Sequence, residues 1–267
     1  MRAIILAAGR GLRLQLPEDR QQPKCLLRFG GMSLLERHLH ILRGAGVEEI
    51  VLGLGYRCEL VEAELARLDW QPQPKIVLNP DFELGSVLTV HTVADALTRG
   101  GSVLLMDADV LYDERMMRAL IAGEQPVNRL LIDRDFEAGE EPVKLCVRKG
   151  VPIELRKQLP ARLRYDLIGE SIGFFRFDEL TARRFAAIVA RFVASGRSHM
   201  PHEEAVRDLL QEHSAVFDVA DVTGIPWIEI DFIDDVARAA QDVLPQLQPL
   251  SRFSDYAPDG RRAVVED

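Results

Sequence analysis

Short apolar, β-branched runs alternate with helical patterns through the first 110 residues. The runs at 3–6, 49–52, 75–78 and 102–106 predict strands, and the stretches 33–43, 57–68 and 86–97 predict helices. Such alternation is typical of parallel strands with helices on both faces of the sheet. The first helix has the clearest start, because Ser33 and Glu36 form a capping box ahead of an apolar face.

The second half of the chain is less regular. It predicts strands at 127–132, 143–147, 171–177 and 228–230, and helices at 178–195, 202–213 and 234–244. We therefore expect an α/β fold with a mixed, mostly parallel sheet and a small β-rich portion within 127–177. One domain is predicted over 1–248, with halves at 1–110 and 111–248. The polar, aperiodic segment 249–267 is expected to be a mobile tail.

Composition narrows the class of protein. The 33 basic and 42 acidic side chains give a net charge of −9, which argues against a general nucleic-acid binder. No run approaches the about 20 apolar residues of a membrane span, and the apolar run at 3–8 is short for a signal peptide. We expect a cytoplasmic protein without nucleic-acid or membrane partners. Three widely spaced cysteines predict neither a disulfide framework nor a zinc site.

The most informative stretch is a glycine-rich loop after the first predicted strand. It reads Leu6-Ala7-Ala8-Gly9-Arg10-Gly11-Leu12-Arg13 and is followed by Pro23-Lys24. Residues 10–28 contain five basic and two acidic side chains, and small residues let backbone N–H groups approach an anion. The loop therefore suits a polyphosphate. It is not a Walker A loop, which needs Gly-Lys-Ser/Thr, nor a dinucleotide fingerprint, because Leu14 stands where the third glycine would be.

Carboxylates follow two predicted strands. Asp107 and Asp109 come directly after the strand at 102–106, where open α/β sheets place their ligands. Paired carboxylates at such a strand end can bind a hard cation. An ordinary helix N-cap is the structural alternative, but Asp113 is better placed for that role. Asp231 follows the strand at 228–230, and Glu229 shares its side-chain parity and could share its site.

The order of these motifs resembles the signature LAAGxGxRL…PK of the nucleotidyltransferases that activate sugar phosphates and phospho-alcohols. The resemblance covers the first 110 residues well and continues more weakly to about residue 245. It implies a Rossmann-like fold of the GT-A type and transfer of NMP from an NTP to a phosphorylated acceptor, with release of pyrophosphate. It also implies catalytic roles for Lys24, Arg13 and Asp109. The implied nucleotide-binding residues are Leu6, Ala7, Ala8, Gly9, Arg10, Gly11, Asn79, Gly85, Ser86 and Asp107.

The same resemblance implies a magnesium ion on Asp109 and Asp231. On the acceptor side it suggests Lys157 for the phosphate, with Glu170, in a turn at 169–173, and Glu203 for a hydroxyl or an amine. Residues 148–164 are strongly basic, and a solvated basic face remains the alternative for them. His199 and His202 have no other candidate ligands nearby in the sequence, so we expect no zinc site there.

Several alternatives stay open at the level of sequence. The compact chain looks most like the choline-phosphate, phosphonate and inositol-phosphate cytidylyltransferases, so CTP is the expected donor. Sugar-1-phosphate nucleotidyltransferases are the nearest alternative. The Asp-Ala-Asp pattern also occurs in metal-dependent glycosyltransferases, and a non-catalytic nucleotide-sensing domain is a third interpretation. The sequence leaves a homodimer open.

Overall fold

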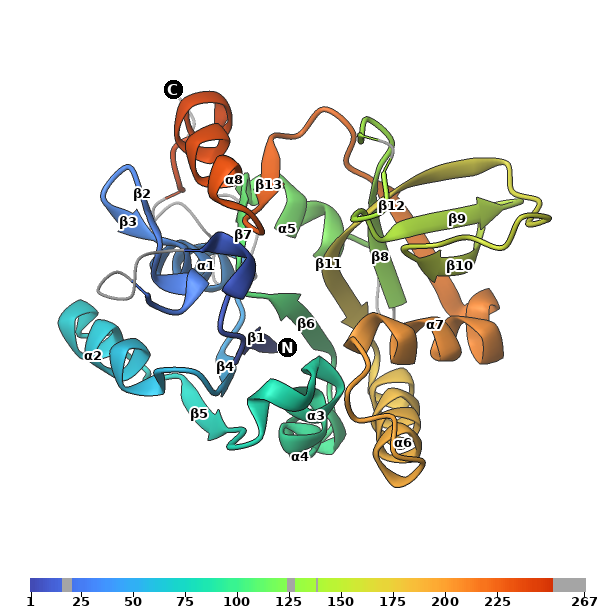
Figure 1. The fold of residues 1–267 in the computed structure, drawn as a ribbon, viewed down its shortest axis with the longest axis horizontal. Helices are drawn as coiled ribbons and strands as arrows, with labels where there is room; N and C mark the ends of the chain where they lie inside the picture. The colour runs from blue at the N-terminus through green and yellow to red at the C-terminus, as the bar shows by residue number, and fades with distance from the viewer. Residues whose placement is uncertain (16–20, 124–127, 138, 252–267) are drawn as a thin grey trace.

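The computed structural model describes residues 1–15, 21–123, 128–137 and 139–251 (Figure 1). Its main strands are β1 (Arg2–Ala7), β4 (Glu49–Leu54), β5 (Lys75–Leu78), β6 (Val103–Asp107), β8 (Asn128–Asp133), β9 (Lys144–Arg148), β10 (Val151–Arg156), β11 (Leu167–Phe177) and β12 (Phe217–Asp221). They form one nine-stranded sheet along the path β10-β9-β11-β6-β1-β4-β5, with β8 beside β11 and β12 beside β8. The pairs among β1, β4, β5 and β6 are parallel, whereas β11 runs antiparallel to its neighbours.

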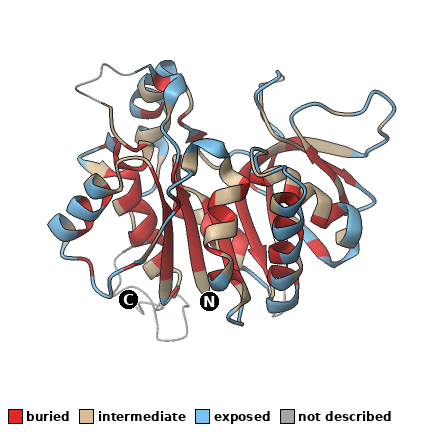
Figure 2. Ribbon diagram, turned by 60° about the horizontal axis from the view of Figure 1, so that its bottom comes forward, coloured by how far each residue is buried: buried red, intermediate tan, exposed pale blue. Residues whose placement is uncertain are grey.

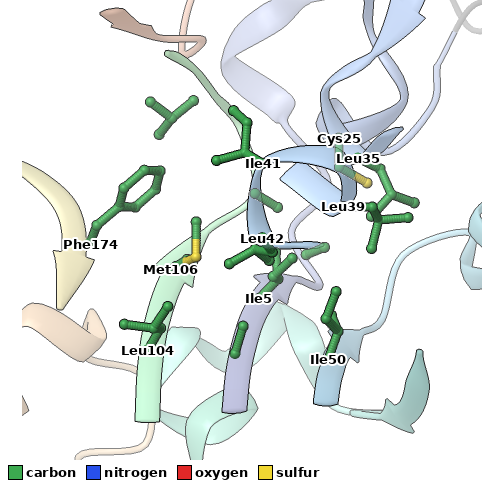
Figure 3. Close-up of a cluster of buried hydrophobic side chains, with 14 of the residues drawn as sticks. Ile5, Cys25, Leu35, Leu39, Ile41, Leu42, Ile50, Leu104, Met106 and Phe174 are labelled. Atoms are coloured by element: carbon green, nitrogen blue, oxygen red, sulfur yellow. The ribbon is translucent and has the colours of Figure 1, made fainter. Parts of the chain in front are cut away.

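Helices cover both faces of this sheet. They are α1 (Leu34–Gly44), α2 (Cys58–Leu68), α3 (Ser86–Thr92), α4 (Ala94–Thr98), α5 (Glu114–Ile121), α6 (Glu179–Ala194) and α7 (His202–His213). A further helix, α8 (Ile233–Arg238), packs on a separate apolar cluster that includes Leu14 and Ile228. Alternate residues of β1 point to opposite faces, so Ile5 packs with α1, α2 and α5, and Ile4 packs with α3, α4, α6 and α7. Figure 2 shows the buried strands between helices with exposed outer faces, and Figure 3 shows the core around Ile5.

The predicted mixed α/β sheet is confirmed, with local differences. The helix predicted at 86–97 is divided at Val93 into α3 and α4. The predicted turn at 169–173 is wrong, because these residues belong to β11. Gly169 serves close packing there, since a Cβ on it would lie 2.3 Å from the carbonyl oxygen of Asp133. The edge strand β10 was not predicted, because Pro152 interrupts its pattern and a bulge follows it.

A small second sheet positions Glu229 and Asp231, the carboxylates predicted near the end of the chain. It pairs β13 (Trp227–Glu229) antiparallel with β7 (Val110–Tyr112), and the N–H of Ile230 donates to the carbonyl of Asp109 at 2.9 Å. The end of β13 is thereby fixed next to the loop after β6. Segments far apart in the sequence meet at one end of the sheet.

The nine-stranded sheet includes strands from both predicted halves of the domain. Residues 249–251 belong to the fold rather than to a mobile tail, because Leu250 packs on the core and Ser251 Oγ donates to Glu114 Oε1 at 2.6 Å. The rest of the predicted tail, 252–267, lies outside the described residues, as does residue 127 of a predicted strand. No helix in the described part of the chain has both the length and the apolar composition needed to cross a bilayer.

Candidate active site

Two adjoining cavities open at the carboxyl ends of β1 and β6. One, of about 580 Å³, is lined by the glycine-rich loop, and the other, of about 320 Å³, extends toward β11 and α7. Both are lined by Leu6, Gly9, Arg13, Lys24, Phe82 and Asp109. The predicted phosphate loop and the predicted carboxylates therefore face one continuous space.

The glycine-rich loop is shaped by close contacts. The N–H of Tyr56 donates to the carbonyl of Ala8 at 3.0 Å just after β1 ends. Gly11 has φ of 63°, in the left-handed region, and a Cβ on it would lie 3.0 Å from Lys24 Cγ. Glycine is favoured at this position because it accepts that conformation and lets Lys24 approach the loop. Arg10 reaches across the loop and pairs with Glu83 at 2.8 Å.

Lys24 joins the two predicted metal-binding aspartates. Its Nζ donates to Asp109 Oδ2 and to Asp231 Oδ1, both at 2.8 Å, and Arg13 donates to Asp231 at 2.6 Å. Burial alone would lower the pKa of Lys24, but Asp109 and Asp231 outweigh that effect and raise its pKa above the ordinary value. The lysine therefore carries its charge across the physiological pH range.

The carboxylates of Asp109, Glu229 and Asp231 converge. One oxygen from each lies within 4.8 Å of the others. Burial, and then the neighbouring charges of Asp109 and Asp231, raises the pKa of Glu229 well above its usual range. A purely oxygen donor set suits a hard cation such as Mg²⁺. These residues fit the ion predicted from the sequence, and Glu229 stands where its strand parity placed it.

Asp107 belongs to a different group. Its carboxylate lies near His202 and Glu203, and one ligand atom of each lies within 4.8 Å of the others. Burial, followed by the charges of Glu203, Asp109 and Glu229, raises the pKa of Asp107 well above its usual range. The expectation that His202 has no candidate ligands nearby was wrong, because the adjacent Glu203 converges with it and Asp107 reaches it from β6, far away in the sequence.

Three of the implied nucleotide-binding residues, Asn79, Gly85 and Ser86, follow β5, and the structure brings two of them to the second cavity. Gly85 and Ser86 are among its lining residues. Asn79 is buried, its amide donates to Thr89 Oγ1 at 3.0 Å, and its oxygen accepts from the N–H of Asp81. The side chain of Asn79 therefore supports the loop and is not among the residues that line the cavities.

The predicted acceptor residues are also divided. Lys157 and Glu203 line the second cavity, and Lys157 pairs with Glu141 at 2.9 Å. Glu170 lies instead in β11 opposite Asp133 and outside the cavity lining. Burial, and then the charge of Asp133, raises the pKa of Glu170 to about 7. The basic segment 148–164 is not uniformly solvated, because Arg156 pairs with Glu204 at 2.9 Å.

Several lining residues were missed from the sequence, among them Phe82, Glu141 and His202. Phe82 lines both cavities and packs on Gly55, because a Cβ on Gly55 would lie 2.5 Å from the Cβ of Phe82. The position of Phe82 in the loop after β5 could have indicated from the sequence that it lies at the site. Glu141 and His202 reach the site from the second half of the chain, and no local pattern marks them.

Comparison with known proteins places the chain among nucleotidyltransferases. Residues 3–168 match the family model described as the MobA-like NTP transferase domain. This match covers more than half of the chain, including the glycine-rich loop, Lys24 and Asp109.

Three related proteins match most of this chain. The bifunctional IPC transferase and DIPP synthase of Rubrobacter xylanophilus is 29% identical over 91% of this chain, which spans 52% of that protein. The CTP:phosphoglutamine cytidylyltransferase of Campylobacter jejuni is 24% identical and covers 88% of this chain and 98% of its own length. The CMP-5′-(3-aminopropyl)phosphonate synthase of Streptomyces rubellomurinus is 26% identical over 90% of this chain, which spans 38% of that protein.

Two solved structures share the fold. The inositol-1-phosphate CTP transferase from T. maritima superposes with a TM-score of 0.71 at 21% identity, over 92% of this chain and 95% of that one. The CTP:phosphocholine cytidylyltransferase from Streptococcus pneumoniae gives 0.70 at 20% identity, over 90% and 97%. At these identities the likeness establishes a common architecture.

Proposed function

Because the chain belongs to the MobA-like NTP transferase domain family and is thus a nucleotidyltransferase, we propose that it transfers CMP from CTP to a phosphorylated small alcohol or a phosphonate and releases pyrophosphate. The observation that carries the proposal is the position of Lys24 between Asp109 and Asp231, beside the glycine-rich loop. The names of three relatives, which refer to IPC, phosphoglutamine and an aminopropylphosphonate, support the class of acceptor.

The proposed reaction forms one bond and breaks one. A phosphate or phosphonate oxygen of the acceptor attacks the α-phosphorus of CTP, and the bond from that phosphorus to the β-phosphate oxygen breaks. The nucleophile is already an anion, so the step requires no strong base. The main barrier is the repulsion between two anionic substrates, which positively charged groups and backbone N–H groups can relieve.

The residues that line the first cavity, together with Glu229 and Asp231 of the second, are suited to that task. We assign the backbone of Gly9–Gly11, with Arg10 and Arg13, to the triphosphate. Lys24 supplies a permanent positive charge at the α-phosphate, where negative charge increases during attack. A magnesium ion, when held by Asp109, Glu229 and Asp231, would supply further neutralisation of phosphate charge.

The second cavity is assigned to the acceptor. Lys157 offers a cation for its phosphate, and Glu203 offers a carboxylate for a hydroxyl or an amine. A sugar 1-phosphate is a less supported acceptor. The mannose-1-phosphate guanyltransferase of Neurospora crassa is 32% identical, but the match covers only 41% of this chain. A match of that length cannot span the lining residues of both cavities, because these residues come from the two halves of the domain.

A pyrophosphate-release screen tests the proposal. Four NTPs are each combined with phosphocholine, inositol 1-phosphate, a 3-aminopropylphosphonate and mannose 1-phosphate, with magnesium present. We expect release with CTP and a phospho-alcohol or phosphonate, and a CMP-linked product by mass spectrometry. Sugar transfer from a nucleotide-sugar without pyrophosphate release would instead support the glycosyltransferase alternative. NTP binding without turnover would support a sensing domain.

A further inference from the structure

The Asp107–His202–Glu203 cluster lines the second cavity beside the Asp109–Glu229–Asp231 group, and the two groups share no residue. Its two carboxylates form no ion pair with a lysine or arginine in the described ranges; the only pairs recorded for them are with His202. Asp109 and Asp231 differ in this respect, because each of them forms an ion pair with Lys24. Two converging carboxylates without a cationic partner are costly to keep charged in a cavity.

His202 provides the observation that goes beyond an acidic cluster. Its side chain is only 3% exposed, and Nε2 has no hydrogen-bond partner among the described residues. Asp107 Oδ1 lies 3.8 Å from this nitrogen. That separation is too long for a hydrogen bond but suits two ligands of one metal ion, each at about 2.0–2.2 Å from it.

A metal ion on Nε2 requires the tautomer in which the other ring nitrogen, Nδ1, carries the proton. Nδ1 lies 3.2 Å from Glu203 Oε2 and 3.2 Å from Ser86 Oγ, and that hydroxyl already accepts the backbone N–H of His202 at 2.8 Å. If Nδ1 carries the proton, it donates to Ser86 Oγ and leaves a lone pair on Nε2. Histidines that bind metals commonly hold their second ring N–H in a hydrogen bond in this way.

The backbone also makes room for the cluster. Gly173 has φ of 76°, and a Cβ on it would lie 2.3 Å from Asp107 Oδ2. The pairing of β11 with β8 is interrupted between Ser171 and Phe175, so this part of β11 bends away beside Asp107. Ser171 Oγ is buried, lines the same cavity and has no hydrogen-bond partner among the described residues.

We propose that Asp107, His202 and Glu203 form a second divalent-metal site, which takes a transition metal such as Mn²⁺, Co²⁺ or Zn²⁺ in preference to Mg²⁺. One imidazole nitrogen and carboxylate oxygens are the donors such ions favour, whereas Mg²⁺ prefers oxygen alone. The ion adds positive charge on the acceptor side of the cavity. Its binding needs neither NTP nor acceptor, so it can be measured whether or not the proposed reaction occurs.

Cobalt titration of the metal-free full chain tests the site. Visible d–d absorption and equilibrium dialysis report the number of Co²⁺ ions bound, first alone and then with excess Mg²⁺. We expect two ions, of which one resists Mg²⁺. His202→Gln should lose the resistant ion, Asp231→Asn should lose the other, and the control His199→Gln, an exposed neighbour, should keep both.

Pulsed EPR with Mn²⁺ in place of Co²⁺ gives a readout that tests the histidine directly. We expect nitrogen coupling from an imidazole in the unmodified protein, and its loss in His202→Gln. Circular dichroism checks folding, and Asp107→Asn provides a second variant that should weaken the resistant ion. The proposal is overturned if the unmodified protein shows no Mg²⁺-resistant ion or no nitrogen coupling. It is also overturned if folded His202→Gln keeps the resistant ion and the nitrogen coupling. A cluster that ignores metals but binds an aminoalkylphosphonate would be an ammonium site instead.

Discussion

Lys24 illustrates how single side chains determine the chemistry of this site. It is one cation between two carboxylates, and we assign its charge to the α-phosphate during nucleotidyl transfer. Lys24→Ala should therefore lower kcat more than it raises KM, because its interaction strengthens as charge develops. Loss of one such group typically costs about 10²–10³-fold. Steady-state pyrophosphate release with CTP measures the effect.

Two controls make this prediction specific. Lys24→Arg keeps the charge and should retain more activity than the alanine variant. Lys75→Ala removes an exposed lysine from β5 and should leave kcat unchanged. An unchanged kcat in a folded Lys24→Ala protein would remove this lysine from the mechanism.

At the residue scale, the sequence predicts best where a motif is contiguous. The loop around Gly9 and Gly11 could be identified because strand, glycines and basic residues follow one another. Asn79 could not be judged in that way, because its partner Thr89 lies on another element. His202 has Glu203 beside it in the sequence, but Asp107 joins them only when the folded chain brings α7 next to β6. Long-range contacts of this kind leave no local pattern.

At the scale of elements, β11 carries an energetic cost. Glu170 faces Asp133 across the β8–β11 pair, and burial and this like charge raise the pKa of Glu170 to about 7. In the unfolded chain, the carboxyl group of a glutamate loses its proton at about pH 4.3. The folded state therefore holds more protons between those values, and this group lowers the stability as pH rises through that interval.

Glu170→Gln should remove this pH-dependent cost. At about pH 8, we expect the free energy of unfolding of the variant to exceed that of the unmodified protein by about 1–2 kcal/mol. This energy is reduced from the full pKa shift because Glu170 is partly exposed to solvent. The two proteins should be nearly equal near about pH 4, where the carboxyl is protonated in both states. Urea unfolding at both pH values measures this, with Glu62→Gln, at an exposed position of α2, as control. Equal stability at both values would contradict the shifted pKa.

The prediction of elements succeeded where periodicity was strong. The range of α7 and that of β5 were predicted to the residue, because apolar spacing and flanking turns agree there. Glycines misled the prediction in β11, since Gly169 and Gly173 suggested a turn but allow close packing against Asp133 and Asp107. A single sequence does not distinguish these two uses of glycine.

At the scale of the whole molecule, the fold brings Asp109 and Asp231 together from distant parts of the chain. We predict that magnesium is required and that the two aspartates act as a unit. Asp109→Asn and Asp231→Asn should each abolish most activity, and the double variant should cost little more than either alone. Pyrophosphate release at saturating Mg²⁺ measures the three variants. Additive losses would show that the carboxylates serve separate sites.

The choice of nucleotide also depends on the assembled molecule, because we expect the base to occupy the cavity lined by the glycine-rich loop and Phe82. We predict that CTP is preferred, in keeping with the two relatives whose names refer to CTP or CMP. A cavity that hydrogen-bonds one edge of a base can reject bases that leave its polar groups unpaired. Equimolar CTP, UTP, GTP and ATP compete for one acceptor, and the product masses give the preference. A dominant UDP- or GDP-linked product would instead indicate a sugar-phosphate nucleotidyltransferase, with the roles proposed for Lys24 and Asp109 unchanged.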